Sequence, residues 1–373
     1  MGEWREIKLE EVVKFGNGKK KPNTEGNIPI YGGNGILGYS SEYNYNDETI
    51  IIGRVGAYCG SVYYEDSPIW LSDNALSAKP KNDNNTKFLY YFLKHAQLNQ
   101  HAGGSSHPLV TQTLLNSLEY NFCTNPNEQK AIAEVLSSLD DKIDLLHRQN
   151  RTLEEMAQTL FRQWFIEEAK DDWKKKPLKD FCLKITKGTT PTTLKKQFVD
   201  SGINFIKVNC IDNNGNYLKD KFNFIDEETN VLLSRSQLKN GDILYSIAGT
   251  IGRISIVSED ILPANINQAL AIIRIDKDKI NPNYIRYCIQ DKNITFELHS
   301  KIVHAVQPNL SLGEISNTLI PFPDKDTLNK FSLSINPIEE KIAKNKQQIK
   351  TLENTRDTLL PKLMSGEVRI KDE

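Results

Sequence analysis

The sequence lacks any hydrophobic run of 18 or more residues, so it offers no candidate membrane-spanning helix. Its first residues, Met1-Gly2-Glu3-Trp4-Arg5, lack the apolar stretch of a signal peptide, and we expect a cytoplasmic protein. The five cysteines are scattered, without a Cys-x-x-Cys pair or a histidine at metal-ligand spacing. We therefore expect reduced, mostly buried thiols and no metal site.

Catalytic motifs are also scarce, since no H-E-x-x-H and no serine nucleophile elbow occurs. Residues 33–38 fit G-x-G-x-x-G, but no helical periodicity follows, so we expect no helix N-terminus for a phosphate. Asn281-Pro282-Asn283-Tyr284 resembles the Asn-Pro-Pro-Tyr loop of adenine methyltransferases, yet its third position differs. A helix cap explains that segment better. We predict a protein without a catalytic or cofactor site of its own.

Net charge is nearly absent at −1, but its distribution is uneven. Residues 1–124 carry 11 basic and 13 acidic side chains, and residues 125–172 carry 6 and 11. Residues 173–324 carry 20 and 16, and residues 325–373 carry 10 and 8. The acidic 125–172 segment is a poor surface for phosphates. A nucleic-acid partner would have to be held by local basic faces elsewhere.

The strongest pattern that is present is an internal repeat. Thr152-Leu153-Glu154 reappears 199 residues later as Thr351-Leu352-Glu353. The same shift holds from Leu139, which matches Ile338, to Trp164, which matches Leu363, over about 26 residues without an insertion. Between these segments lie two stretches that share only sparse landmarks. The chain therefore has two similar supports and two different heads, which we place at residues 1–124 and 173–324.

Each repeated segment carries an apolar seam that steps by three and four residues, as in a coiled coil. The first seam consists of Ile132, Leu136, Leu139, Ile143, Leu146, Asn150, Leu153, Ala157, Leu160 and Trp164. The second consists of Phe331, Ile335, Ile338, Ile342, Asn345, Ile349, Leu352, Arg356, Leu359 and Leu363. The simplest partner for each seam is the other, packed antiparallel. A generic oligomerisation coil is the alternative.

Helix start signals give the expected ends of these segments. Asn125 followed by Pro126 predicts that the first long helix begins there. Asn336-Pro337-Ile338-Glu339 has the same cap signature inside the second seam. We therefore expect a short helix, a break, and a long helix from Pro337. The polar Asn150 and Asn345 are expected to fix the register of the pair at some cost in stability.

The heads are predicted to be rich in β-strands, each with a short aromatic helix at residues 88–93 or 284–289. Landmarks recur in the same order in both heads, including a glycine turn at residues 54–57 and again at 247–250. The fold class is α+β, with two β-rich domains separated by two long antiparallel helices in an internal pseudo-twofold repeat. One fold would thus be used twice with different surfaces.

The long helices also contain distinctive sequence motifs. The first contains Glu128-Gln129-Lys130-Ala131-Ile132-Ala133, and it ends in Leu160-Phe161-Arg162-Gln163-Trp164-Phe165. The second ends in Leu359-Leu360-Pro361-Lys362-Leu363-Met364-Ser365-Gly366. Together with Ile30-Tyr31-Gly32-Gly33-Asn34-Gly35, these motifs resemble those of the specificity subunit of Type I restriction–modification systems. The resemblance extends over the whole chain.

The resemblance implies target-recognition domains at 1–124 and 173–324, conserved helices at 125–172 and 325–366, and a tail at 367–373. It implies a non-catalytic subunit that binds double-stranded DNA and assembles with two modification subunits, which dock on the helices. We expect Phe161, Trp164 and Phe165 to form that docking surface, with coil core and end packing as the alternative. S-adenosylmethionine, Mg²⁺ and ATP would belong to the modification and restriction subunits, and no cofactor to this chain.

Two copies of one fold on antiparallel helices would share a pseudo-twofold axis, as duplex DNA does locally. Unlike heads then predict an asymmetric target with two different half-sites about one helical turn apart. Lysine and arginine would contact phosphates, and polar side chains would read bases. In the first head the candidate DNA-binding residues are Lys19, Lys20, Lys21, Asn34, Arg54, Tyr58, Ser105, Ser106 and His107. In the second they are Lys187, Thr189, Thr190, Lys195, Lys196, Arg253, Lys301, His304 and Gln307.

Two other readings stay open from the sequence. The chain could be a coiled-coil scaffold whose heads bind protein or carbohydrate, or a self-sufficient DNA methyltransferase. Steep loss of DNA affinity with salt separates the first from a DNA-recognition subunit. Methylation by the purified chain alone would favour the second.

Overall fold

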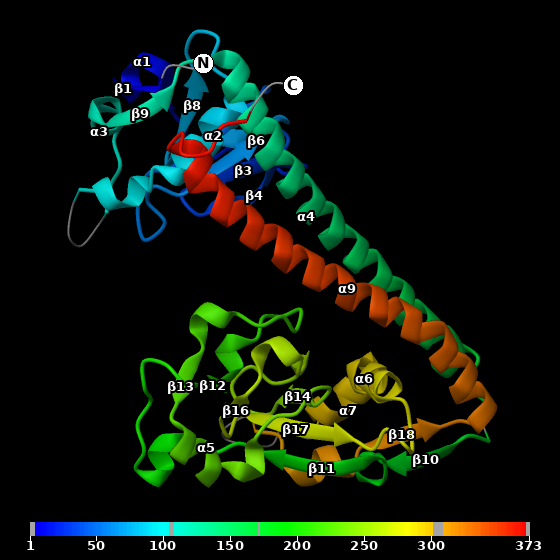
Figure 1. Cartoon of the computed structure of the whole chain (residues 1–373). Coiled ribbons are helices and arrows are strands. Elements are labelled where there is room, and N and C mark those ends of the chain that lie inside the picture. Colours follow the sequence, from blue (N-terminus) through cyan, green and yellow to red (C-terminus); the bar gives the residue numbers. More distant parts are fainter. Residues whose placement is uncertain (1–3, 104–107, 171, 301–308, 371–373) are drawn as a thin grey trace. The chain divides into compact units, whose positions relative to one another are not determined.

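The structure is a computed structural model that describes residues 4–103, 108–170, 172–300 and 309–370. The chain divides into two compact units. The first unit comprises residues Met1–Asn150 and Lys344–Glu373, and the second comprises Arg151–Ala343. Each unit therefore contains one head together with part of each long helix. Figure 1 follows the chain through both units in sequence colours.

The first unit has a β-rich head. Its strands are β1 (Trp4–Lys8), β2 (Val13–Asn17), β3 (Ile28–Gly32), β4 (Gly35–Ser40), β5 (Thr49–Gly53), β6 (Val62–Glu65), β7 (Trp70–Leu71), β8 (Ala75–Pro80) and β9 (Glu119–Cys123). Its short helices are α1 (Leu9–Val12), α2 (Thr86–His95) and α3 (Gln112–Ser117). The strands form a sheet in the order β2-β8-β5-β6, a second in the order β4-β3-β7, and the pair β1-β9.

The second unit has a head built from corresponding elements. Its strands are β10 (Lys174–Pro177), β11 (Cys182–Lys187), β12 (Ile203–Ile206), β13 (Asn223–Ile225), β14 (Ile243–Ser246), β15 (Ile254–Ile256), β16 (Ala264–Ile266), β17 (Leu270–Ile275) and β18 (Leu319–Phe322). Its short helices are α5 (Glu227–Leu232), α6 (Pro282–Gln290), α7 (Lys292–Ser300) and α8 (Leu312–Ser316). The strand orders are β11-β17-β14-β15, β13-β12-β16 and β10-β18.

The two heads have the same topology. Each has a four-stranded antiparallel sheet, a three-stranded sheet with one parallel pair, and a two-stranded antiparallel pair. The parallel pair is β3 with β7 in the first head and β12 with β16 in the second. The predicted aromatic helices are α2 and α6, and each begins after an asparagine cap, Asn85 or Asn281. One fold is therefore used twice, as the recurring landmarks predicted.

The long helices are α4 (Pro126–Arg162), which ends in a π-helical turn (Gln163–Glu167), and α9 (Lys325–Met364). The predicted start of α4 is confirmed, because Asn125 Oδ1 accepts hydrogen bonds from the backbone N–H groups of Asn127 and Glu128. The predicted break at Pro337 is wrong, since α9 continues through it. Proline removes one backbone hydrogen bond. Burial of Phe331 and Ile335 before it and Ile342 after it keeps the helix continuous.

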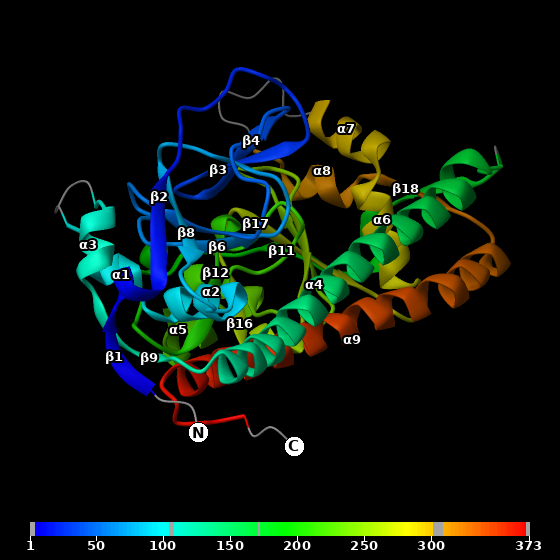
Figure 2. The same cartoon turned by 90° about the horizontal axis from the view of Figure 1, so that it is seen from above.

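The seams pair with each other antiparallel within the first unit, where α4 and α9 lie side by side in both views (Figures 1 and 2). Asp140 on α4 meets Arg356 on α9 at 2.7 Å, and ten residues further along α4, Asn150 meets Asn345 at 2.9 Å. The residue number rises on one helix and falls on the other. Asn345 Nδ2 therefore donates to Asn150 Oδ1 between the two seams, whereas Asn345 Oδ1 is buried without a hydrogen-bond partner among the described residues.

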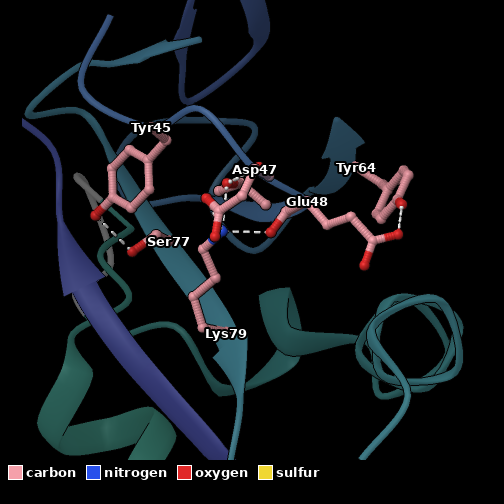
Figure 3. Close-up of polar contacts among 7 residues, drawn as sticks. Tyr45, Asp47, Glu48, Tyr64, Ser77 and Lys79 are labelled. Atoms are coloured by element: carbon pink, nitrogen blue, oxygen red, sulfur yellow. Dashed lines mark hydrogen bonds and ion pairs between the residues drawn. The ribbon is translucent and has the colours of Figure 1, made fainter. Parts of the chain in front are cut away.

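An ion pair near the end of an inner strand of the four-stranded sheet also recurs, in two different forms. In the first head, Lys79 on β8 bonds Asp47 at 2.6 Å, and the Asp47 side chain is 68% exposed (Figure 3). In the second head, Arg274 on β17 grips Asp242 through two bonds of 2.7 and 2.6 Å, and Asp242 is 1% exposed. The hydrogen bond with Asp242 raises the pKa of the Arg274 guanidinium.

Candidate nucleic-acid interface

The loop after β2 in the first head and the loop after β11 in the second begin at matching close contacts. A Cβ atom at Gly18 would lie 1.8 Å from the carbonyl oxygen of Ser72, and one at Gly188 would lie 1.9 Å from that of Ile266. Only glycine fits such an approach. The residues that follow, Lys19 in one head and Thr189 in the other, are thereby held at equivalent places.

Backbone contacts gather the first head's candidates around the β3–β4 turn. The N–H of Lys19 donates to Leu71 O at 2.9 Å, and the N–H of Arg54 donates to Asn74 O at 3.0 Å. A Cβ atom at Gly33, beside the exposed Asn34, would lie 3.1 Å from the carbonyl oxygen of Val55. The loop with Lys19, Lys20 and Lys21 (the lysine loop), the β3–β4 hairpin turn at residues 33–34 and the glycine turn at residues 54–58 therefore form one loop cluster.

The same cluster exposes large apolar side chains, which we call the hairpin patch. Its members lie on β4 and in the glycine turn and are 39–56% exposed, namely Ile36, Leu37, Tyr39, Val55 and Tyr58. The exposed Lys21 lies beside the patch, since its Nζ atom would be 3.5 Å from a Cβ atom at Gly38 on β4. Among these residues only Asn34, Tyr58, Arg54 and the lysines were predicted from sequence. The exposed positions of β4 could not be identified from the sequence without its strand pairing.

In the second head the loop candidates are engaged with neighbouring loops. The Oγ1 atom of Thr189 accepts a hydrogen bond from Arg235 at 3.2 Å, and Arg235 also donates to the carbonyl oxygen of Lys187 at 3.3 Å. Thr190 donates to Gln268. Arg235 and Gln268 were missed from sequence because their partners are 46 and 78 residues distant.

Two further lysine candidates follow in the same loop. Lys195 is exposed at a left-handed backbone position with φ 57°. Lys196 forms an ion pair with Glu228 at 2.7 Å, and this hydrogen bond raises the pKa of the Lys196 ammonium group.

Arg253 binds its own chain. Its guanidinium donates to the carbonyl oxygens of Ile211 at 2.7 Å and Val208 at 3.3 Å, and to Asn213 Oδ1 at 2.9 Å. These bonds hold the start of the 207–222 connection between β12 and β13. The guanidinium therefore supports a loop, and a base contact by Arg253 stays a prediction.

A pocket of about 500 Å³ opens beside Arg253 in the second head. Lys207, Asn209, Thr250 and Asn267 also line it. Within the described ranges, Arg253 Nε and Asn267 Oδ1 are buried without a hydrogen-bond partner. Both atoms belong to residues that line the pocket, but each atom is itself shielded from solvent. Lys207, Asn209 and Asn267 were not predicted from the sequence.

Six predicted residues lie outside the described ranges, namely Ser105, Ser106, His107, Lys301, His304 and Gln307. Both apparent catalytic motifs have structural explanations. Residues 33–38 form the hairpin turn and the start of β4. Asn281 caps α6, with its Oδ1 atom accepting from the N–H of Asn283 at 2.9 Å.

The expected docking aromatics pack inside the second unit. Phe161 and Phe165 are 4% and 2% exposed, and both rings contact Phe331 of α9. Trp164 is partly buried against the same ring. Phe161 and Phe165 therefore form end packing of the helices, the alternative weighed from sequence, and their rings are not available to a partner. The sequence signal for this packing was the seam position of Phe331, which all three aromatic rings contact.

In each unit, a cluster of polar side chains also connects a helix of the head to a long helix. In the first unit, the Tyr91 hydroxyl on α2 donates to Asp140 on α4 at 2.7 Å, and Arg356 pairs with the same carboxylate. In the second unit, the Tyr287 hydroxyl on α6 donates to Glu339 on α9, which Arg286 also contacts. Burial, followed by the bond to Asp140, raises the pKa of Tyr91, so its hydroxyl stays a neutral donor.

Within the described parts of the chain, no group of three or more His, Cys, Asp or Glu residues has the arrangement of a metal site. Over the same residues, no helix is long and apolar enough to cross a bilayer.

A family model described as the Type I restriction modification DNA specificity domain matches residues 1–155 and 170–354. The chain belongs to this family. The two matches correspond to the two heads with their adjoining helices, so the chain is a Type I restriction–modification specificity subunit, a class whose members recognise DNA.

Individual specificity subunits are similar over most of the chain. The Type I restriction enzyme MjaIX specificity subunit of Methanocaldococcus jannaschii is 29% identical over 349 residues, covering 84% of this chain and 76% of its own length. The EcoBI specificity subunit of Escherichia coli is 25% identical over 367 residues, covering 86% and 76%. The crystal structure of an S subunit from M. genitalium shares the fold, with a TM-score of 0.65 at 18% identity, covering 97% of this chain and 96% of that one.

Proposed function

We propose that each head reads one half of an asymmetric, two-part DNA site, while the helix pair sets the spacing and docks two modification subunits. The observation that carries this proposal is the identical strand order of two heads whose loops differ. A repeated scaffold suits binding to two similar stretches of DNA groove. Different loops suit recognition of two different half-site sequences.

The first head would read its half-site through the hairpin patch and the lysine loop. Apolar side chains recognise the thymine methyl group, and they also wedge between base steps that unstack readily. Lys19, Lys20 and Lys21 are exposed beside this patch and would contact phosphates.

The second head would read its half-site through hydrogen bonds. Its pocket presents Lys207, Asn209 and Asn267, which are residue types that bind purine edges in the major groove. The exposed Asn209 side chain would hydrogen-bond to adenine, and Lys207 would donate to guanine. Lys187, Lys195 and Lys196 would supply the phosphate contacts.

The modification subunits would dock on exposed apolar positions of the helices, one in each unit. The first unit offers Leu145 at 39% exposure, and the second offers Met156 at 50% and Leu333 at 77%. The outer edge of Trp164 would extend the second surface. S-adenosylmethionine would be bound by the docked subunits, and restriction subunits would add ATP-driven cleavage.

Co-expression of the chain with a modification subunit, followed by mapping of methylated adenines, tests the proposal. We expect an asymmetric motif with a non-specific spacer, and a palindromic or single-part motif would contradict it. Purified chain alone should incorporate no methyl groups. DNA binding by the complex should weaken steeply with salt, by roughly 10³-fold or more between 50 and 200 mM if about six phosphates are contacted.

A further inference from the structure

The two polar clusters at the head–helix contacts occupy matching places in the repeat. Asp140 and Glu339 are 199 residues apart, the offset at which the helices repeat. Tyr91 and Tyr287 are 196 apart, on the matching helices α2 and α6. A tyrosine hydroxyl therefore donates to a long-helix carboxylate at the same point of each unit.

The arginine that pairs with the carboxylate comes from a different element in each unit. In the first unit, Arg356 comes from the opposite long helix. The matching position in the second unit is Ala157, which is fully buried. There Arg286 comes from the head itself, stacked on the Tyr287 ring with its guanidinium 4.5 Å from the ring centre. Its matching position in the first head is Tyr90.

Each unit thus contains one hydroxyl, one carboxylate and one guanidinium, although the arginine stands at non-matching positions of the repeat. These groups are well shielded, since the side chains of Arg356 and Asp140 are 20% and 25% exposed. Those of Arg286 and Glu339 are 17% exposed each. Apolar packing is non-directional, whereas hydrogen bonds fix angles. A cluster of this kind constrains how the head is turned on its helix.

We propose that Tyr91–Asp140–Arg356 and Arg286–Tyr287–Glu339 are positioning joints, which hold each head at a fixed angle and so determine how strictly spacer length is read. This proposal rests on the two-part reading proposed above. Adding one base pair to a spacer moves one half-site by about 3.4 Å and turns it by roughly 35°. A head that pivots on a loosened joint tolerates that change, and a fixed head rejects it.

The first test uses Tyr91→Phe and Arg356→Ala in the full chain, each assembled with modification subunits. Methylation rates are measured on duplexes carrying both half-sites with the native spacer or with one base pair added or removed. We expect the preference for the native spacer to fall about tenfold, the effect of losing one charge-assisted hydrogen bond. The preference for the correct bases in each half-site should be unchanged.

Lys130→Ala is the matched control, because it removes a long-helix cation from an exposed pair with Glu134 at 3.9 Å. It should leave the spacer preference intact. The rescue variant combines Arg356→Ala with Tyr90→Arg, which moves the second unit's arrangement into the first. Strict spacing should return, since the new guanidinium would stack on Tyr91 and reach Asp140 as Arg286 reaches Glu339.

The outcomes separate this proposal from the one beneath it. If the unmutated complex methylates a two-part site and the joint variants keep its spacer preference, the joints do not position the heads. A uniform loss of rate on all spacers, with a lowered melting temperature and no rescue, would assign the clusters to stability alone. If the unmutated complex reads a single-part site, both proposals fail together.

Discussion

The two heads differ most where their three-stranded sheets turn. In the first head, β3 and β4 are joined by Gly33 and Asn34 alone, and the hairpin presents apolar side chains. In the second head, β12 and β13 are joined by residues 207–222. Arg253 donates hydrogen bonds to the start of this connection, and residues 207–209 line the pocket beside Arg253. The strand order is the same on both sides of this difference.

The comparison teaches which parts of the fold are free to change. The close approaches at Gly18 and Gly188 recur in both heads, and in each a carbonyl oxygen leaves no room for a side chain. Connections between strands contribute little to the core and can lengthen at small entropic cost. The two heads therefore differ in the connections between strands, and the strand scaffold beneath them is the same.

The largest expected effect comes from the recurring ion pair. Arg274→Ala leaves the carboxylate of Asp242 buried and unpaired, and should lower the free energy of unfolding by about 3–5 kcal/mol. Lys79→Ala, at the matching place, leaves an exposed Asp47 and should cost about 1 kcal/mol. Urea denaturation of both variants measures the difference. Equal losses would show that burial of the acid does not control the strength of this pair.

The glycine contacts should respond alike in both heads. Gly18→Ala and Gly188→Ala each drive a Cβ atom into a backbone carbonyl, so we expect each to cost about 3 kcal/mol. Thermal unfolding of the two variants checks the match. A large loss for one and none for the other would mean that the two loops are not held in the same way.

The arginines of the glycine turns should behave differently. Arg253→Ala removes three hydrogen bonds from the 207–213 segment and should cost about 2 kcal/mol. It should also weaken methylation at the second half-site only. Arg54→Ala should change stability little, because Arg54 Nε is buried without a hydrogen-bond partner among the described residues. Equal destabilisation by the two changes would argue against a loop-supporting role for Arg253.

The smallest expected effect is at the asparagine pair of the helices. Its counterpart under the 199-residue shift is Leu146 with Ile349, which is apolar. Asn150→Leu with Asn345→Leu should therefore stabilise the chain, by about 1 kcal/mol, because Asn345 Oδ1 is buried without a partner in the described structure. Asn150→Leu alone should destabilise it, since Asn345 then loses its contact. A stabilising single change would contradict this account.

Sequence alone predicted the helices and the repeat because periodic burial fixes both. The seam positions Ile132 to Leu363 and the cap at Asn125 needed no knowledge of tertiary contacts. The predicted helix break at Pro337 was wrong because the low helix propensity of proline was outweighed by burial of seam residues on both sides. The site was predicted less well. The supporting role of Arg253 depends on carbonyl groups about 40 residues away, and the pocket arises from three separate loops.

The most direct test of the central claim exchanges residues 173–324 for the matching domain of another family member and maps methylated adenines with the same modification subunits. The account predicts that one half of the recognised motif changes while the other half is preserved. A motif that changes in both halves, or in neither, would contradict the assignment of one half-site to each head.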